Sequence, residues 1–235
     1  MKLQRIENLN KQFEENNWDG VVLNSALTQR FFKIKDWKSP LMISAPHAVN
    51  HIREGEKIHS DILTWGLALY LSECFNLPII YSTWCEVWDP NYDPYEISTY
   101  KQELKSYIIN KNIKFLIDLH WCWSERDFII ELWTWWENHP NILWDEKLLE
   151  IIKWSLEQSF NTYIKHTKKE ITVNTLFPAK NVNTISKFIA KELHIPALQI
   201  EINKELRDTK KEQMNILVSA LENIIKGVEF YLIWD

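Results

Sequence analysis

Along the chain, short apolar runs typical of β-strands alternate with segments whose apolar residues recur at helical spacing. Short apolar runs that are β-branched or aromatic predict strands at 20–24, 41–45, 79–82, 114–119, 128–132 and 197–202. Apolar residues at helical spacing predict helices at 58–75, 95–111, 145–160, 184–193 and 208–231. This alternation is typical of βαβ units, so we expect an α/β domain with a mixed, largely parallel sheet.

The composition is that of an ordinary globular protein. The chain has 235 residues, 46% of them hydrophobic, and no internal repeat or linker rich in Pro and Gly, so we expect one domain over residues 1–235. The net charge of −5 argues against a nucleic-acid partner. No apolar run approaches the roughly 20 residues that span a bilayer. The first residues lack the apolar stretch of a secretory signal. We therefore expect a cytoplasmic protein without a membrane partner.

Glycine is rare in this chain and tryptophan is abundant. There are 4 glycines and 13 tryptophans, whereas average usage predicts about 16 glycines. Several tryptophans stand after strands, where a chain often needs glycine: Trp84, Trp88, Trp121, Trp123, Trp133, Trp135 and Trp136. We interpret several of these letters as glycine, because UGA encodes tryptophan in some bacterial codes and glycine in others. The alternative is a Trp-rich surface that binds a carbohydrate or another partner.

Polar side chains follow the predicted strand at 41–45. His47, His51, Arg53, Glu54 and Glu56 all lie within the ten residues that begin at His47. In open α/β sheets the ligand site lies beyond the carboxyl ends of the strands. These side chains are therefore candidates for a functional site.

Two further strands end in the same way. His120 comes directly after the strand at 114–119, with Asp118 two residues before it. Glu201 interrupts the apolar strand at 197–202, and Asn203 follows on the same face. Burial of a carboxylate in such a strand costs about 2 kcal/mol or more of folding free energy unless the carboxylate is paired or associated with a metal.

Two imidazoles and a carboxylate at the mouth of a sheet are the ligand set of a catalytic zinc ion. Glu201 is then free to act as the general base for water. Each residue alone also has a simpler interpretation. A histidine after a strand is often a hydrogen-bonded structural residue, Glu54 and Glu56 can be solvated charges, and Glu201 can pair with a buried arginine.

The segments SAPHAVNHIREGE, DPNYD, FLIDLH and LQIEIN, in that order and spacing, resemble the N-formylglutamate amidohydrolase family. The resemblance covers residues 41–208. That family is related to the poly-γ-glutamate hydrolases and to the zinc carboxypeptidase-like fold. The resemblance implies a three-layer α/β/α fold and a zinc-dependent amide hydrolase with one zinc ion per chain.

The resemblance also implies roles for single residues. His47 and His120 match metal ligands, and a carboxylate of the HIREGE segment matches the third. We expect this third ligand to be Glu54, with Glu56 as the alternative. Glu201 matches the general base and proton shuttle.

The expected substrate is a small N-acyl amino acid or a short peptide. N-formylglutamate or a similar acyl-glutamate fits best, and a γ-glutamyl or cell-wall peptide amide is the alternative. Arg126 is the candidate that stabilises the oxyanion or holds a substrate carboxylate. Arg53 and Arg207 are second choices, and Asn91 is expected to add an amide contact. For each arginine, a surface ion pair is the alternative.

Two hypotheses from other classes remain. In the first, Cys122 is the nucleophile of a cysteine hydrolase and His120 is its base. In the second, the chain is a non-catalytic domain that binds sugars on exposed tryptophans.

Overall fold

The computed structural model describes residues 2–16, 31–84, 88–135, 140–167, 169–176, 183–208 and 212–234. Its centre is a seven-stranded sheet of order β1-β5-β2-β6-β9-β7-β8. The strands are β1 (Phe32–Lys35), β2 (Leu41–Ala45), β5 (Ile79–Ser82), β6 (Phe115–Cys122), β7 (Phe128–Trp133), β8 (Glu170–Val173) and β9 (Ala197–Asn203). The four strands β5, β2, β6 and β9 run parallel. Strand β1 pairs antiparallel with β5, and β7 pairs antiparallel with β9 but parallel with β8. The sheet is therefore mixed and largely parallel, as expected.

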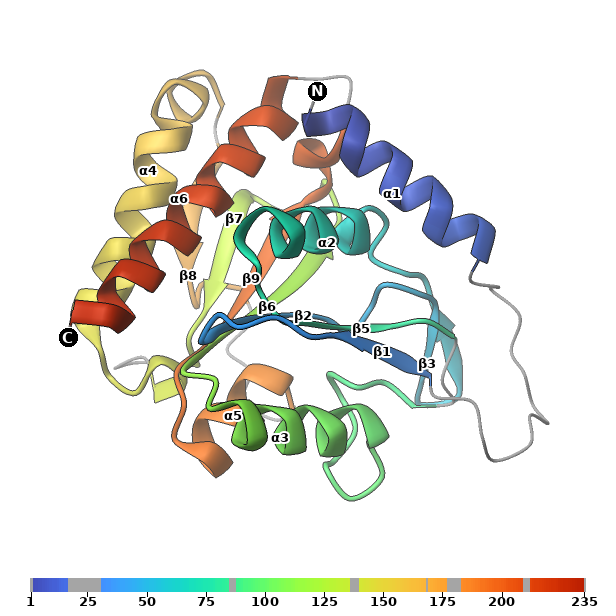
Figure 1. Cartoon of the computed structure of the whole chain (residues 1–235). Coiled ribbons are helices and arrows are strands. Elements are labelled where there is room, and N and C mark those ends of the chain that lie inside the picture. The colour runs from blue at the N-terminus through green and yellow to red at the C-terminus, as the bar shows by residue number, and fades with distance from the viewer. Residues whose placement is uncertain are drawn as a thin grey trace.

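Helices cover both faces of this sheet. They are α1 (Lys2–Asn16), α2 (Thr64–Phe75), α3 (Thr99–Lys111), α4 (Glu146–His166), α5 (Ile185–Leu193) and α6 (Glu212–Trp234). Figure 1 shows α2, α4 and α6 on one face and α3 and α5 on the other, with α1 beside α2. The expected three-layer α/β/α architecture is confirmed. None of the helices within the described ranges is long and apolar enough to cross a membrane.

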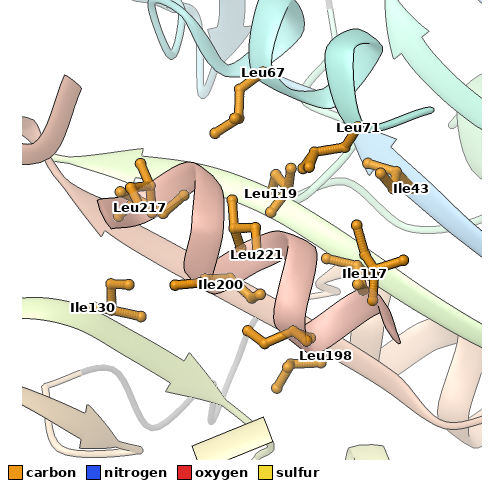
Figure 2. Packing of buried hydrophobic residues seen from close by; sticks show 14 of the residues in the cluster. Ile43, Leu67, Leu71, Ile117, Leu119, Ile130, Leu198, Ile200, Leu217 and Leu221 are labelled. Carbon is orange, nitrogen blue, oxygen red and sulfur yellow. The ribbon is translucent and has the colours of Figure 1, made fainter. Parts of the chain in front are cut away.

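Alternate residues of the central strands point to opposite faces, as in any strand. On one face, Ile117, Leu119 and Ile200 pack against α2 and α6 in the main core, which Figure 2 shows from close by. On the other face, Leu116 and Ala197 pack beneath α3 and α5 in a second core.

Toward the carboxyl ends of β6 and β9, the face beneath α3 and α5 changes from apolar to polar. The register pairs Leu116 with Ala197, and two and four residues further along it pairs Asp118 with Gln199 and His120 with Glu201. The polar pairs are buried. Burial of four such side chains is costly unless they hold each other or a ligand, so this end of the sheet is where a site is expected.

Most predicted elements are present, with shifted ends. The strand predicted at 20–24 lies outside the described residues. The predicted helix at 58–75 begins only at Thr64, because a small antiparallel hairpin of β3 (His51–Arg53) and β4 (Glu56–Ile58) comes before it. The hydrophobic pattern did not predict α1 or the two edge strands, β1 and β8. These two strands have four residues each and include exposed polar residues.

Candidate metal centre

Adjacent parallel strands carry the two histidines. His47 lies two residues beyond the end of β2, and His120 lies near the end of β6, the neighbouring strand. Both are buried, with 6% and 2% of their surface exposed. Because β2 and β6 run parallel, their carboxyl ends meet at the same edge of the sheet, and the two rings lie with their centroids 4.7 Å apart.

A carboxylate completes a triangle of potential ligand atoms. The Nδ1 atoms of His47 and His120 lie 3.1 Å apart. Asp61 Oδ2 lies 3.5 Å from the first and 3.3 Å from the second. Tetrahedral zinc with bonds of 2.0–2.1 Å separates its ligands by about 3.3 Å. The three atoms therefore match one face of a zinc coordination tetrahedron.

The outward-facing nitrogens of both rings are held by carboxylates. His47 Nε2 lies 2.8 Å from Asp89 Oδ1, and His120 Nε2 lies 3.2 Å from Asp118 Oδ2. Histidines that bind a metal commonly have such a carboxylate on the second nitrogen, because it fixes the tautomer and the ring orientation. The geometry thus turns each Nδ1 toward the centre of the triangle.

The buried carboxylates give this centre a preference for positive charge. Burial opposes protonation of His47, but Asp89 and Asp61 outweigh it and raise the pKa of His47 to about 9. The pKa of His120 is also raised well above its ordinary value, by Asp118 and Asp61 against the effect of burial. In turn, hydrogen bonds with the two imidazoles hold the pKa of Asp61 below its usual range despite burial. A divalent cation suits such a centre.

A second group of potential ligands shares one histidine with the first. His47, His51 and Asp89 also have ligand atoms close together, and the rings of His47 and His51 are stacked 3.9 Å apart. In this group, however, Asp89 already pairs with a cation, since a terminal guanidinium nitrogen of Arg53 lies 2.6 Å from Asp89 Oδ2. The triangle of His47, Asp61 and His120 is therefore the better metal site.

Glu201 lies beside this triangle. It pairs with His120 across β6 and β9, and it is 8% exposed. Gln199 Nε2 donates a hydrogen bond of 2.9 Å to Glu201 Oε1. Burial raises the pKa of Glu201, and the nearby His120 opposes this shift. A buried carboxylate with a raised pKa is suited to accepting and releasing a proton.

The structure does not bring Glu54 to the histidines. Glu54 occupies an exposed turn of the β3–β4 hairpin, where it has a φ of 53° and accepts a hydrogen bond from the Tyr92 hydroxyl. Glu56 is exposed in β4. The carboxylate that faces both imidazoles is Asp61. A single aspartate just before an apolar helix resembles a helix-entry residue, so nothing in its local sequence distinguished it.

The cations predicted for the substrate have different surroundings. Arg53 lines the same cavity as the other two arginines, but it pairs with Asp89, as described above. Arg126 and Arg207 line a cavity of about 1720 Å³ into which His47, His120 and Glu201 also open. The guanidinium of Arg207 lies over the Trp121 ring at 5.5 Å, and burial lowers the pKa of Arg207.

Asn91 also lines the cavity, but both ends of its side-chain amide contact the protein. Its Oδ1 accepts a hydrogen bond from the backbone N–H of Ile185, and its Nδ2 donates to Gln199. These contacts differ from the substrate contact that the sequence predicted.

Comparisons with known proteins show the fold. No family model and no curated protein matches the sequence. The gene product Atu2144 from Agrobacterium tumefaciens has a TM-score of 0.56 and 12% identity, over 86% of this chain and 95% of that one. The N-formylglutamate amidohydrolase from Ralstonia eutropha JMP134 has a TM-score of 0.52 and 12% identity, over 84% of this chain and 97% of that one. At the level of the fold, these likenesses confirm the resemblance to the N-formylglutamate amidohydrolase family.

Proposed function

We propose that this chain is a zinc-dependent hydrolase that cleaves the amide bond of an N-acyl amino acid, with N-formylglutamate or a similar acyl-glutamate as substrate. The observation that carries the proposal is the triangle of two buried imidazole nitrogens, at the carboxyl ends of parallel strands, and one half-buried carboxylate oxygen. The likeness in fold to an N-formylglutamate amidohydrolase supports the reaction class.

His47, Asp61 and His120 are the residues that would hold the ion. Nitrogen and oxygen ligands on three sides are typical of catalytic zinc sites, in which a fourth position stays open. When bound, zinc supplies Lewis acidity and lowers the pKa of water toward about 7. Asp89 and Asp118 orient the two rings for this role.

Glu201 is the residue that moves the proton. Gln199 occupies Oε1 of Glu201, which leaves Oε2 for the reacting groups. We infer that Glu201 accepts a proton from the attacking water and passes it to the amine that leaves. Its raised pKa brings proton affinity closer to neutral pH, where acid–base catalysis is most efficient.

The arginines at the cavity suit an acidic substrate. Arg126 and Arg207 present cations at the same cavity as Glu201. A guanidinium can bind a carboxylate with two parallel hydrogen bonds, which gives orientation as well as affinity. This favours an acyl-glutamate over an uncharged amide.

One observation favours a larger substrate as the second candidate. The cavity volume of about 1720 Å³ exceeds the roughly 300–1,000 Å³ of ordinary small-molecule sites. A γ-glutamyl or cell-wall peptide amide would use this space, whereas a formyl-amino acid fills only a small part of it.

The cysteine hypothesis has less support. Burial, together with Glu201, raises the pKa of Cys122 to about 12. The thiol is then neutral at physiological pH, while the thiolate is the nucleophile. The sugar-binding hypothesis does not account for the buried histidines, although Trp123 is exposed at the cavity.

Hydrolysis assays with N-formyl-L-glutamate, N-acetyl-L-glutamate and a γ-glutamyl peptide test the proposal. We expect activity on at least one of them, loss of it with a strong chelator, and recovery with zinc. Glu201→Gln should retain zinc and lose about 10²–10⁴-fold in kcat. Resistance to the chelator combined with inactivation by a thiol-alkylating reagent would instead support the cysteine enzyme.

A further inference from the structure

A chain of buried side-chain amides connects helix α5 to Glu201. The backbone N–H of Ile185 donates to Asn91 Oδ1 at 2.8 Å. Asn91 Nδ2 donates to Gln199 Oε1 at 3.5 Å, and Gln199 Nε2 donates to Glu201 Oε1 at 2.9 Å. All three side chains are buried, with exposed fractions of 7%, 1% and 8% from Asn91 to Glu201. We call Asn91, Gln199 and Glu201 the amide relay.

The direction of every hydrogen bond in the relay follows from the first one. Ile185 is the first residue of α5, and its backbone N–H can only donate. Asn91 must therefore present its oxygen to Ile185, which leaves its NH₂ group for Gln199. Gln199 must in turn present its oxygen to Asn91, which leaves its NH₂ group for Glu201. The helix end thus determines that Glu201 receives a donor.

The segment that carries Asn91, between β5 and α3, also contacts the candidate metal centre. The backbone N–H of Asn91 donates to Asp89 Oδ1 at 2.8 Å, the oxygen that contacts His47 Nε2. One short segment therefore orients a metal-ligand candidate through Asp89 and the catalytic carboxylate through Asn91 and Gln199.

We propose that Asn91 and Gln199 are positioning residues that hold Glu201 in its reactive orientation. This inference rests on the proposed role of Glu201 as general base. Because Gln199 holds Oε1 by a hydrogen bond, the carboxylate group of Glu201 cannot turn freely, and its other oxygen, Oε2, stays available to the reacting groups. Preorganisation of this kind matters because small misplacements of a catalytic group reduce the rate strongly.

The variant Asn91→Asp tests the direction of the relay. An aspartate still accepts from Ile185, but it offers Gln199 an oxygen in place of an NH₂ group. Gln199 should then turn its amide over, so that its oxygen faces Glu201 and repels the carboxylate. Gln199→Met removes the donor altogether with little change in volume. The matched control is Asn141→Asp, because Asn141 is another buried amide that contacts the first turn of α5, through Ser186, and is not part of the relay.

Three measurements separate the outcomes: crystal structures of the zinc-replete variants, zinc content, and kcat and KM on the best substrate found. In both relay variants we expect Glu201 Oε1 to leave the position seen here, zinc content to stay at the wild-type level, and kcat to fall about 10–100-fold with KM nearly unchanged. Asn141→Asp should retain the wild-type kcat.

An unmoved Glu201 in folded Gln199→Met and Asn91→Asp would overturn the relay. If the wild type hydrolyses none of the substrates, the proposed function fails, while the position of Glu201 still decides the relay.

Discussion

At the scale of single residues, the carboxylate beside the two histidines differs from the one that the sequence predicted. Asp61 Oδ2 lies within 3.5 Å of both imidazoles, whereas Glu54 lies in an exposed turn. We expect Asp61→Asn to lower the affinity for zinc by about 10-fold or more, because a carboxylate ligand is lost. Glu54→Gln is the matched control and should bind zinc as the wild type does. Metal titration with a competing chelator measures both, and the reverse order of effects would contradict the ligand set.

The tryptophan positions give a second prediction at this scale. Trp135 and Trp144 have φ values of 58° and 61°, in the left-handed region that glycine adopts readily and bulky side chains rarely do. Trp135 is one of the positions interpreted as glycine, so this backbone conformation agrees with the interpretation at that position. We predict that the protein purified from its natural source has an intact mass below 28.3 kDa by a multiple of the Trp–Gly mass difference. A mass equal to that of the printed sequence would contradict the interpretation.

The meeting of His47 and His120 could be predicted because each one stands at or just beyond the carboxyl end of a predicted strand. Parallel strands bring their carboxyl ends together whatever the rest of the fold does, so His47, His120 and Glu201 were expected to meet. Asp61 could not be predicted in this way. Its approach to the histidines depends on where α2 begins, and the β3–β4 hairpin that delays this helix has only three residues in each strand.

At the scale of elements, Lys101 ties the loop after β5 to the start of α5. It is fully buried in α3, and its Nζ donates to the backbone carbonyls of Asp93 and Asn183. Burial lowers the pKa of Lys101 to about 8, although Asp89 and Asp93 oppose the shift. The folded protein therefore releases this proton at a lower pH than the unfolded chain.

This pKa predicts how stability depends on pH. Between about pH 8 and pH 10.4 the unfolded chain holds the Lys101 proton and the folded protein does not, so the free energy of unfolding rises with pH. Relative to Lys101→Met, we expect the wild type to gain about 3 kcal/mol across this range. Urea unfolding of both proteins at a series of pH values measures the difference. A difference that stays constant with pH would show that Lys101 does not titrate in this range.

The elements of the core could be predicted more securely than those at the edges. The strands β2, β5, β6 and β9 are covered by helices on both faces, so their sequences are mainly hydrophobic, and in β6 and β9 polar residues enter only toward the carboxyl ends. The edge strands β1 and β8 have one open side and carry polar residues, FKIK and EITV, which weakens the signal. Helix α1 was missed because its apolar positions are few.

At the scale of the whole molecule, one face of the sheet serves two purposes. On the face covered by α3 and α5, the residues nearer the amino ends of β6 and β9 are apolar and pack beneath these helices. The residues nearer the carboxyl ends of the same strands are the polar side chains of the candidate metal centre. The opposite face is apolar along its full length and packs against α2, α4 and α6 (Figure 1). The buried polar groups of the centre are thus backed by a closely packed apolar layer on the far side of the strands, and this arrangement suits a preorganised site.

The central claim is that His47, Asp61 and His120 bind zinc together. Diffraction at the zinc absorption edge, from crystals of zinc-replete protein, tests it most directly. We expect one anomalous peak in the triangle, at about 2.0–2.2 Å from each imidazole Nδ1 and from Asp61 Oδ2. No peak there, or a peak on His51 and Asp89 instead, would contradict it.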